Sequence, residues 1–297
     1  MKLMITGALG YIGTELLSQL YNTNIEIIAV DNDKQAISTR LGSFLNRKQF
    51  SFYNIDIADA KSVSKLPKVD LIIHLACVVG YIKCNDTPEL AHKTNVVGTQ
   101  NLSNLNTPIV FVSTGSVYGE IGKVCNEQTD INPKSLYAEH KALGEQIIQT
   151  VPNVILRPAT LFGCSYKIRD DLLVHNLIKD AVANKQIDVY QPNALRSFYN
   201  IGKMANLLKH ICNNFNRYKS KIINVGCESG NLTKLQVCQI IKKYTPLDIN
   251  IIDGQDLDNR DYNIDYTVLK LHWSDYDENF EQHIQPLVTF YENTSNR

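Results

Sequence analysis

A tyrosine and a lysine stand four residues apart in the segment Tyr137-Ala138-Glu139-His140-Lys141, and Thr114 ends an apolar run upstream of them. On a helix, residues at i and i+4 lie on one face, one turn apart. The ordinary pKa of tyrosine is about 10, so tyrosine acts as a base at neutral pH only when its anion is stabilised. The lysine ammonium can supply that stabilisation, while the threonine hydroxyl can hydrogen-bond a reacting hydroxyl or carbonyl. This set predicts proton transfer to or from a reacting hydroxyl or carbonyl, but such a pair arises often by chance and its meaning depends on the elements around it.

The beginning of the chain predicts one of those elements, a phosphate-binding turn. Residues 1–6 form a short apolar run, glycines at Gly7, Gly10 and Gly13 break it, and residues 14–20 carry apolar side chains at helical spacing. The first glycine permits a tight turn, the second lets a pyrophosphate approach the backbone, and the third allows close packing of helix on strand. The free N–H groups at the start of the helix then face the phosphates.

Two acidic residues at strand ends predict the adenosine half of the same site. A β-branched strand, residues 25–30, ends at Asp31, whose carboxylate can accept hydrogen bonds from ribose hydroxyls and would repel a 2′-phosphate. This favours NAD over NADP, and we expect Asn32 to contribute beside it. Asp56, after the next strand, can accept a hydrogen bond from the adenine amino group while Ile57 packs on the ring. The alternative is that Asp56 only caps the helix that follows.

The next two strands lead to the predicted catalytic residues. Residues 69–76 are almost all apolar, as in a strand buried on both faces. His74 near its end is a candidate base, although a histidine packed beneath the nucleotide is the better interpretation. Asn95 interrupts a helical pattern with a residue of low helix propensity, and if it faces the core it should hold a water or a backbone group. Residues 108–114 form a strand that ends in hydroxyls, and the helix of Tyr137 follows.

Composition excludes several classes of protein. The chain has 297 residues, a net charge of zero and 20% charged residues, so it presents no basic field for nucleic acid. No apolar run reaches the roughly twenty residues of a membrane span. Met1 leads directly into the first strand, and we therefore expect no signal peptide and a cytoplasmic protein. The seven cysteines are scattered and never spaced C-x-x-C, which predicts free thiols and neither disulfides nor a metal site.

These motifs, in this order, resemble the NAD-dependent nucleotide-sugar epimerase/dehydratase family of extended short-chain dehydrogenase/reductases. The resemblance rests on Gly7-x-x-Gly10-x-x-Gly13, Asp31, Asp56-Ile57, His74-Leu75-Ala76, Asn95-Val96-Val97-Gly98-Thr99, Ser113-Thr114 to Val117-Tyr118-Gly119, and Tyr137-x-x-x-Lys141. It implies an α/β fold with a Rossmann-type doubly wound parallel sheet and a smaller mixed α/β substrate-binding region. It also implies a homodimer built from the helices that carry Asn95 and Tyr137.

The resemblance assigns roles to single residues. Tyr137 becomes the acid/base, Lys141 also holds the nicotinamide ribose, Thr114 fills the catalytic Ser/Thr position, and Asn95 supports the site. Further NAD contacts are expected at Tyr11, Ile12, Leu75 and Ala76.

The second half of the chain is expected to bind the substrate. We expect an NAD-binding domain over residues 1–165 and a substrate-binding region over residues 166–297 that is partly interleaved with the first sheet. By the resemblance, Asn176, Arg196 and Arg260 contact the diphosphate of a nucleoside-diphosphate sugar. Arginine suits this task because its planar fork binds phosphate oxygens in pairs, although a single arginine is more often a surface charge.

The position after the catalytic threonine bears on the reaction. Family 4,6-dehydratases carry carboxylates directly after the catalytic Ser/Thr, whereas this chain has Gly115 and Ser116. That favours hydride transfer at C4 by a 4-dehydrogenase or a 4-epimerase. Several segments are similar to a branch that oxidises C4 of GDP-linked manno-heptose. The alternatives are a 4,6-dehydratase, a 4-keto reductase, a hydroxysteroid or flavonoid reductase, and a non-catalytic NAD-binding sensor.

Overall fold

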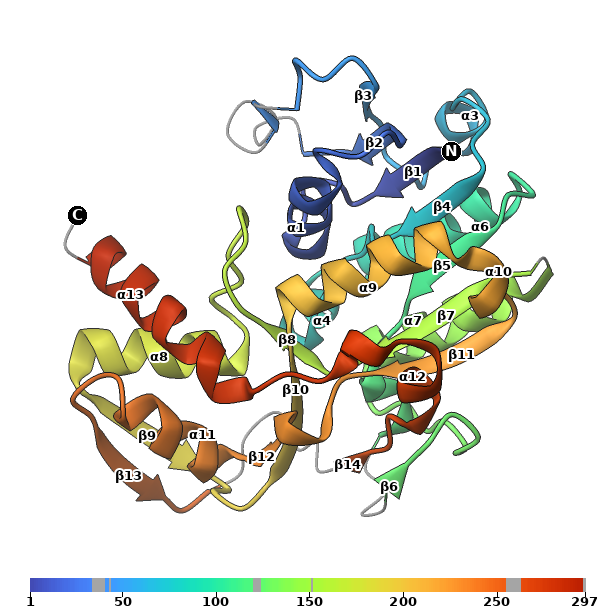
Figure 1. Ribbon diagram of the computed structural model, residues 1–297. Helices are drawn as coiled ribbons and strands as arrows, with labels where there is room; N and C mark the ends of the chain where they lie inside the picture. The colour runs from blue at the N-terminus through green and yellow to red at the C-terminus, as the bar shows by residue number, and fades with distance from the viewer. Residues whose placement is uncertain (34–40, 43, 120–123, 151, 255–262, 296–297) are drawn as a thin grey trace.

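The structure is a computed structural model that describes residues 1–33, 41–42, 44–119, 124–150, 152–254 and 263–295. Seven parallel strands form its central sheet, in the order β11-β7-β5-β4-β1-β2-β3 (Figure 1). The strands are β1 (Lys2–Thr6), β2 (Glu26–Asp31), β3 (Phe50–Asn54), β4 (Leu71–His74), β5 (Ile109–Val112), β7 (Val154–Pro158) and β11 (Lys221–Val225). The chain reverses direction across the sheet between β1 and β4, and ligands bind at the carboxyl ends of strands beside such a reversal. The predicted doubly wound α/β fold is confirmed.

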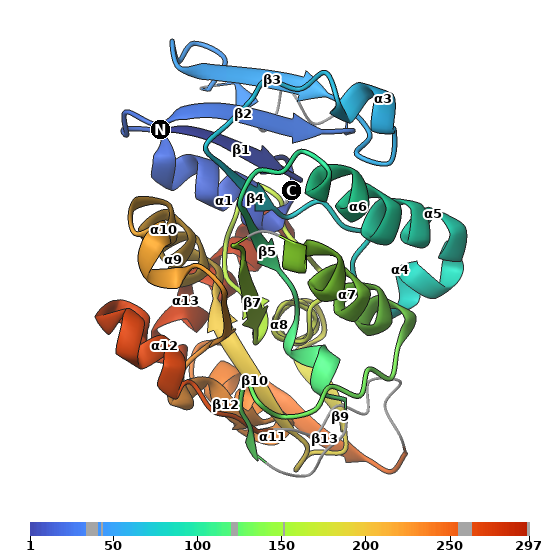
Figure 2. The ribbon, with the colours of Figure 1, turned by 90° about the vertical axis from the view of Figure 1, so that its right-hand side faces the viewer.

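Helices cover both faces of this sheet (Figure 2). On one face lie α1 (Tyr11–Leu20), α9 (Ile201–Asn213), α10 (Phe215–Tyr218) and α12 (Thr267–His272); on the other lie α3 (Ala60–Val63), α6 (Gly98–Ser103) and α7 (Leu136–Ile147). The side chains of strand β1 pack into two hydrophobic clusters, one on each face of the sheet. Leu3 and Ile5 pack in the cluster with α1 and α9, whereas Met4 between them packs with Ile72 and Phe111 in the other cluster. Successive side chains of a strand point to opposite faces, so a strand covered on both faces reads as continuously apolar.

The long helix expected around Asn95 is broken into three parts. Helix α5 (Pro88–His92) is followed by a π-helical turn, η2 (Lys93–Val97), and then by α6. The π-turn contains Asn95, which is buried with 3% of its surface exposed. Single π-turns within helices are frequent at functional sites. The break in the helix therefore turns Asn95 inward, where its amide has a specific partner.

A second lobe lies beyond the carboxyl ends of the large sheet (Figures 1 and 2). It contains a three-stranded sheet, two small strand pairs, and helices that pack on them. The strands are β8 (Thr160–Phe162), β10 (Leu195–Asn200), β12 (Asn231–Thr233), β9 (Gln186–Tyr190), β13 (Asp248–Ile252), β6 (Val124–Cys125) and β14 (Asn263–Ile264); the helices are α8 (Leu173–Asn184), α11 (Lys234–Lys242) and α13 (Ile284–Ser295). Helix α4 (Tyr81–Asp86) packs instead against α5 and α7, beside the large sheet. The described residues also form short 3-10 turns: η3 (Gly115–Tyr118), η4 (Ile148–Thr150), η5 (Glu228–Gly230), η6 (Ser274–Tyr276) and η7 (Phe280–His283). Strand β11 and helices α9 and α12 of the first lobe come from the second half of the chain. The two lobes are therefore interleaved along the sequence.

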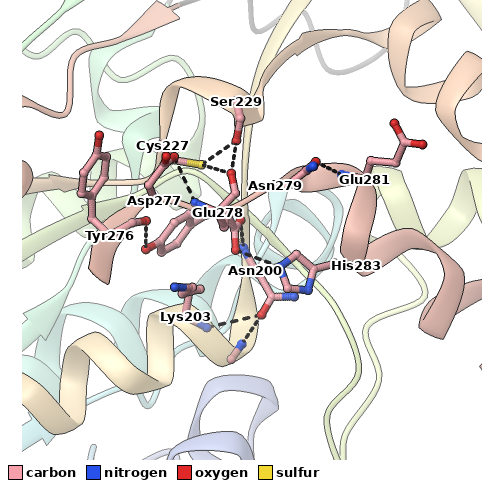
Figure 3. A network of polar contacts seen from close by, with 12 residues as sticks. Asn200, Lys203, Cys227, Ser229, Tyr276, Asp277, Glu278, Asn279, Glu281 and His283 are labelled. Carbon is pink, nitrogen blue, oxygen red and sulfur yellow. Dashed lines mark hydrogen bonds and ion pairs between the residues drawn. The ribbon is translucent and has the colours of Figure 1, made fainter. Parts of the chain in front are cut away.

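A polar network joins the lobes where β10 ends and α9 begins (Figure 3). The Asn200 side chain caps α9 by accepting hydrogen bonds from the backbone N–H groups of Gly202 and Lys203. The backbone N–H of Asn200 donates to Glu278, whose side chain is 2% exposed and pairs with His283. The ammonium of Lys203 pairs with Asp275 at 2.6 Å. This position is structural and does not reach the site described below.

Within the described part of the chain, no helix combines the length and apolarity needed to cross a membrane. All seven cysteines are free thiols, in agreement with the sequence-based expectation.

Candidate active site

The three glycines of the first turn serve three different contacts. Gly7 has a left-handed φ of 70°, and a Cβ there would lie 2.6 Å from the backbone N of Ala76. A Cβ on Gly13 would lie 2.3 Å from the carbonyl oxygen of Gly7, within the turn itself. A Cβ on Gly10 would approach only Gly7, at 3.0 Å, because its outer side is open. The turn is thus closely packed at Gly7 and Gly13 and open on the outer side of Gly10. A bound pyrophosphate requires such open access to the backbone.

The Asp31 carboxylate is tied to this turn. Its Oδ2 accepts a hydrogen bond from the backbone N–H of Leu9 at 2.9 Å, and its Oδ1 accepts one from Asp33 at 3.0 Å. Asp31 remains partly exposed at the end of β2, and Asn32 is exposed in the bend that follows. Ile12, on the first turn of α1, is partly buried against the core. The carboxylate therefore lies beside the glycine turn, where an adenosine ribose would reach it.

The second acidic position has a different neighbourhood from the one expected. The helix after β3 is capped by Asp59, and Asp56 accepts a hydrogen bond only from the nearby backbone N–H of Ala58, at 2.9 Å. The interpretation of Asp56 as the cap of that helix is therefore wrong. The Ile57 side chain is 4% exposed, and its Cδ1 would lie 2.6 Å from a Cβ on Gly98. Ile57 thus packs against α6, and contact of Asp56 and Ile57 with adenine stays a prediction.

His74 is a structural residue. It is 1% exposed, and its two ring nitrogens lie 2.9 Å from the hydroxyls of Thr6 and Thr99. Burial, and after it the charge of Lys141, lowers the pKa of His74 to about 3. A neutral histidine with both nitrogens engaged cannot serve as the base, which agrees with the preferred interpretation of the sequence. Leu75 follows it and donates its N–H to the Thr6 carbonyl, which places the end of β4 against the glycine turn.

The Asn95 amide holds the loop after β4. Its Oδ1 accepts from the backbone N–H of Val78 at 2.7 Å, and its Nδ2 donates to the Val78 carbonyl at 3.0 Å. Both backbone polar groups of Val78 are therefore bonded to a single side chain. The expected partner of a core-facing Asn95 was a water or a backbone group, and the structure shows the backbone of Val78.

The three predicted catalytic residues come from two neighbouring elements. Thr114 precedes η3, and its hydroxyl accepts from the N–H of Ser116 at 3.2 Å. Tyr137 lies in the first turn of α7, a helix capped by Ser135, and it packs against a small apolar cluster around Val78. Lys141, one turn later, is 5% exposed, and its ammonium lies 4.1 Å from the centre of the Phe111 ring. Burial lowers the pKa of Lys141, because removal from water disfavours the charged ammonium.

An ion pair behind Thr114 was not anticipated from the sequence. Arg157 on β7 donates from Nε and Nη2 to the two carboxylate oxygens of Glu145 on α7, at 3.0 and 2.7 Å. Both side chains are about 5% exposed or less. Glu145 also accepts from the Ser113 hydroxyl at 2.5 Å, and Arg157 donates to the Tyr118 hydroxyl at 3.1 Å. One signal was available: an arginine within an apolar, two-sided strand must have a buried partner.

A second unanticipated network couples the glycine turn to the other lobe. The Tyr11 hydroxyl donates to the Gly163 carbonyl at 2.7 Å, and the Gly163 N–H donates to Nε2 of His175 at 3.1 Å. Burial lowers the pKa of His175 to about 4, so the ring is neutral and its Nδ1–H faces the Tyr291 hydroxyl at 3.1 Å. Tyr291 in turn donates to Asp170 at 2.7 Å. The Tyr11 side chain is thus turned toward the second lobe, which leaves its backbone for the expected NAD contact.

A cavity of about 580 Å³ lies in the second lobe, between α8 and β9. It is lined by Leu173, Asn176, Leu177, Asp180, Asn184, Gln186, Asp188, Val189, Tyr190 and Lys234. Of the three residues predicted to contact a diphosphate, Asn176 lies in this cavity. Arg196 is instead 2% exposed on β10, where its Nη1 donates to the Leu195 carbonyl at 3.2 Å. Arg260 lies outside the described residues.

The glycine contacts predict different results for two alanine substitutions. Gly13→Ala should lower thermal stability, because its Cβ collides with the backbone of the turn, at a cost of about 1–3 kcal/mol. Gly10→Ala should fold like the parent, since Gly10 has an ordinary φ of −75°, yet weaken NAD binding at least about tenfold. Thermal melts and calorimetric titration with NAD measure the two effects separately. Unchanged NAD affinity in Gly10→Ala would contradict the placement of the pyrophosphate.

Comparison with known proteins gives matches over most of the chain. Residues 3–226 match the family model described as the NAD dependent epimerase/dehydratase family. A UDP-glucuronic acid decarboxylase of Arabidopsis thaliana is 27% identical over 271 residues, covering 84% of this chain and 76% of that protein. An uncharacterised UDP-glucose epimerase of Bacillus subtilis is 31% identical over 211 residues, covering 64% and 65% of the two chains.

Solved structures show the same fold at low sequence identity. A UDP-glucuronic acid 4-epimerase from Bacillus cereus, in complex with UDP-glucuronic acid and NAD, has a TM-score of 0.86 at 20% identity, covering 99% of this chain and 100% of that chain. A dTDP-glucose 4,6-dehydratase from Streptomyces venezuelae, with NAD bound, has a TM-score of 0.86 at 20% identity and covers 100% and 98%.

Proposed function

The chain belongs to the NAD-dependent epimerase/dehydratase family, and on that premise we propose that it oxidises a nucleoside-diphosphate sugar at C4, as a 4-dehydrogenase or a 4-epimerase. One observation carries the proposal. Tyr137 and Lys141 on α7 lie next to the segment of Thr114 and η3, while Gly115 and Ser116 follow Thr114 without a carboxylate. A 4,6-dehydratase must move protons at C5 and C6 as well, and acidic groups would be needed there.

The residues around the first turn fit NAD, the cofactor of this family. Gly10 leaves a bare face for the pyrophosphate, and the N–H groups at the start of α1 point to the same face. Asp31 would hold the ribose hydroxyls, and Tyr137 and Lys141 would lie at the nicotinamide end. When bound, NAD accepts hydride from the sugar carbon.

The side chains of the protein then control the proton. Tyr137 takes the proton of the C4 hydroxyl as its phenolate, Lys141 stabilises that phenolate, and Thr114 orients the hydroxyl through a hydrogen bond. The neutral His74 and the uncharged Asn95 clamp hold the surrounding loop and exchange no protons. Oxidation alone gives a 4-keto sugar, and return of hydride to the other face of a rotated keto sugar gives the 4-epimer.

The cavity beside α8 supports a nucleoside diphosphate as the part of the substrate that the second lobe binds. Asn176 and Asn184 lie eight residues apart on α8, about 12 Å at the helical rise of 1.5 Å per residue. That is about the length of a diphosphate and a nucleoside. Asn176 and Lys234 offer an amide and an ammonium for phosphate oxygens, and Lys234 also donates to the Tyr190 carbonyl at 3.3 Å.

The cavity also has two carboxylates in its lining, which favours guanine as the base. They are Asp180 and Asp188, and the amides of Asn184 and Gln186 line the same cavity. A carboxylate can accept hydrogen bonds from the adjacent N–H groups of guanine, whereas uracil presents one N–H between two carbonyl oxygens that a carboxylate repels. We therefore place a GDP-linked sugar first, with GDP-manno-heptose as the leading candidate, although the named relatives act on UDP sugars.

Nucleotide release followed by a substrate panel tests this function. Native mass spectrometry and denaturation of the purified protein identify the nucleotides it carries. Incubation with GDP- and UDP-linked hexoses and heptoses should then give a 4-keto sugar or a 4-epimer with the GDP series, and Asp188→Asn should weaken GDP but not UDP. Turnover of UDP sugars alone would contradict the base assignment. A 4-keto-6-deoxy product would identify a 4,6-dehydratase, and no turnover with NAD still bound would favour a sensor.

We also propose a homodimer. Five large apolar side chains on α4, α5, η2 and α7 are between 36% and 64% exposed: Tyr81, Ile82, Leu90, Val97 and Leu143. Exposed apolar residues gathered on packed helices mark a protein interface more often than a free surface. Sedimentation at twice the monomer mass of 33.6 kDa would support the dimer, and a monomer at working concentration would refute it.

A further inference from the structure

Arg169 lies in the segment between β8 and α8, where it forms a two-pronged ion pair with Asp171. Its Nε and Nη2 donate to the two carboxylate oxygens at 2.6 Å each. The arginine side chain is 20% exposed and the aspartate side chain 60%, so the arginine is the inner member of the pair. These two hydrogen bonds use Nε and Nη2 on one edge of the guanidinium. Nη1, on the other edge, takes part in neither of them.

The ion pair reaches the loop on which Tyr137 rests. A Cβ on Gly80 would lie 3.9 Å from Arg169 Nη2 and 3.9 Å from Asp171 Oδ2. Two residues earlier, Val78 belongs with Cys84 and Ala91 to the small apolar cluster against which Tyr137 packs. The same short loop therefore joins the cluster of the predicted base to the neighbourhood of the arginine, and Asn95 fixes its position through Val78.

The charges in this neighbourhood interact. Burial lowers the pKa of Arg169, but the hydrogen bonds and charge of Asp171 raise it above its ordinary value, and Tyr137 and Tyr11 add to that rise. Electrostatic interactions are reciprocal, so the guanidinium favours a phenolate at Tyr137. Burial raises the pKa of Cys77, whereas the charges of Lys141 and then Arg169 lower it. The charges of Lys141 on α7 and Arg169 in the segment before α8 thus both act on the Cys77 thiol.

We propose that Arg169 is a positioning residue that favours the phenolate of Tyr137 as a second cation beside Lys141, with Asp171 setting how much of its charge the tyrosine senses. The inference rests on the proposed role of Tyr137. Its physical reason is the burial of Lys141, which disfavours the ammonium. A guanidinium stays charged at any pH at which the protein is folded, so it supplies a stabilisation that does not depend on the protonation of Lys141.

Other titratable groups lie on the elements packed around the start of α7. They are Cys77 on the loop after β4, Tyr81, Lys83, Cys84 and Asp86 on α4, Glu89, His92 and Lys93 on α5 and η2, Tyr118 on η3, and Glu139, His140 and Glu145 on α7 itself, beside Lys141, Arg169 and Asp171. Burial raises the pKa of Cys84 to about 11, so this thiol is neutral near pH 7. His140 faces His92 at 5.7 Å between ring centres, and burial followed by His92 lowers the pKa of His140.

The test compares Arg169→Gln, Arg169→Lys and Asp171→Asn, each with Tyr137 and with Tyr137→Phe. Subtracting the ultraviolet titration of each Tyr137→Phe protein isolates the tyrosinate band of Tyr137 without needing a substrate. Arg169→Gln should move the midpoint of that band up by roughly half a pH unit or more, and Arg169→Lys should leave it nearly unchanged. Asp171→Asn, which breaks the same ion pair, should move it down. The acidic limb of kcat/KM should shift in the same directions.

Opposite shifts separate an electrostatic role from a structural one. If the ion pair only supported the loop, Arg169→Gln and Asp171→Asn would change the midpoint and the melting temperature in the same sense. Unmoved midpoints in both variants, with activity lost in Tyr137→Phe, would overturn the role of Arg169 alone. Full activity in Tyr137→Phe would overturn the proposed function itself, whatever the arginine variants show.

Discussion

Tyr137→Phe should lower kcat about a thousandfold, while NAD binding and the melting temperature stay close to those of the parent. A positioned acid/base contributes about 10²- to 10⁴-fold to such reactions, and phenylalanine keeps the ring that packs against the apolar cluster of Val78, Cys84 and Ala91. The loss should fall on kcat and kcat/KM equally, because the proton is transferred only in the chemical step. Turnover of the GDP-sugar identified by the panel, measured through NADH absorbance or product epimer, gives the effect.

Tyr21→Phe is a matched control, since Tyr21 is 40% exposed at the end of α1 and belongs to none of the networks described above. It should retain the activity of the parent. A Tyr137→Phe protein within about tenfold of the parent would show that another group moves the proton. Thr114→Ser, which keeps the hydroxyl, should be far milder than Thr114→Val, because the hydroxyl provides the proposed contact.

Removing one member of the buried pair behind Thr114 should cause the largest loss of stability in the molecule. Arg157→Met leaves Glu145 as a carboxylate without its cation among groups that are about 5% exposed or less. Breaking such a pair costs roughly 3–5 kcal/mol, since the remaining charge has no solvent to replace its partner. Burial opposes the charge of Arg157, yet hydrogen bonds and the charge of Glu145 hold its pKa above its ordinary value, so the guanidinium is charged in the parent.

The double variant Arg157→Met with Glu145→Leu tests the cause. With both charges gone, the loss should be well below the sum of the single losses, as two contacting residues do not act additively. Glu26→Gln serves as a surface control, because its pair with Lys2 is 47% and 32% exposed and should cost less than about 1 kcal/mol. Urea midpoints of the parent, the two single variants, the double variant and Glu26→Gln measure these differences. Single variants as mild as Glu26→Gln would contradict the account.

The parts of the site that could be predicted from the sequence are those encoded by local pattern. Gly10 and Gly13 have their nearest contacts within the turn itself, whereas Gly7 lies against Ala76 just after β4, and Asp31 ends the next strand. For a core-facing Asn95 the sequence predicted a water or a backbone group as partner, and the structure shows the backbone of Val78. The π-turn around Asn95 was missed, since one extra residue in a turn leaves the apolar period almost unchanged.

The parts that could not be predicted depend on residues distant in sequence. Tyr11 and His175 are 164 residues apart, and Arg157 meets Glu145 across a helix and a strand. Neither pairing produces a pattern in the local sequence. A buried histidine or arginine predicts that a polar partner exists, but it does not identify that partner. Arg196 carried a family motif, yet its side chain is buried on β10 and does not line the cavity of Asn176. Phosphate contact by Arg196 stays a prediction.

Because the two lobes are interleaved along the sequence, the order of synthesis on the ribosome limits how the chain can fold. The face of the sheet beside α1 is covered by α9, and the edge at β7 is paired by β11, both of which are translated after residue 200. Until they emerge, the nascent chain exposes apolar side chains and an open strand edge. The first lobe therefore cannot finish folding before most of the second has been made, and the chain reaches its folded state as one unit.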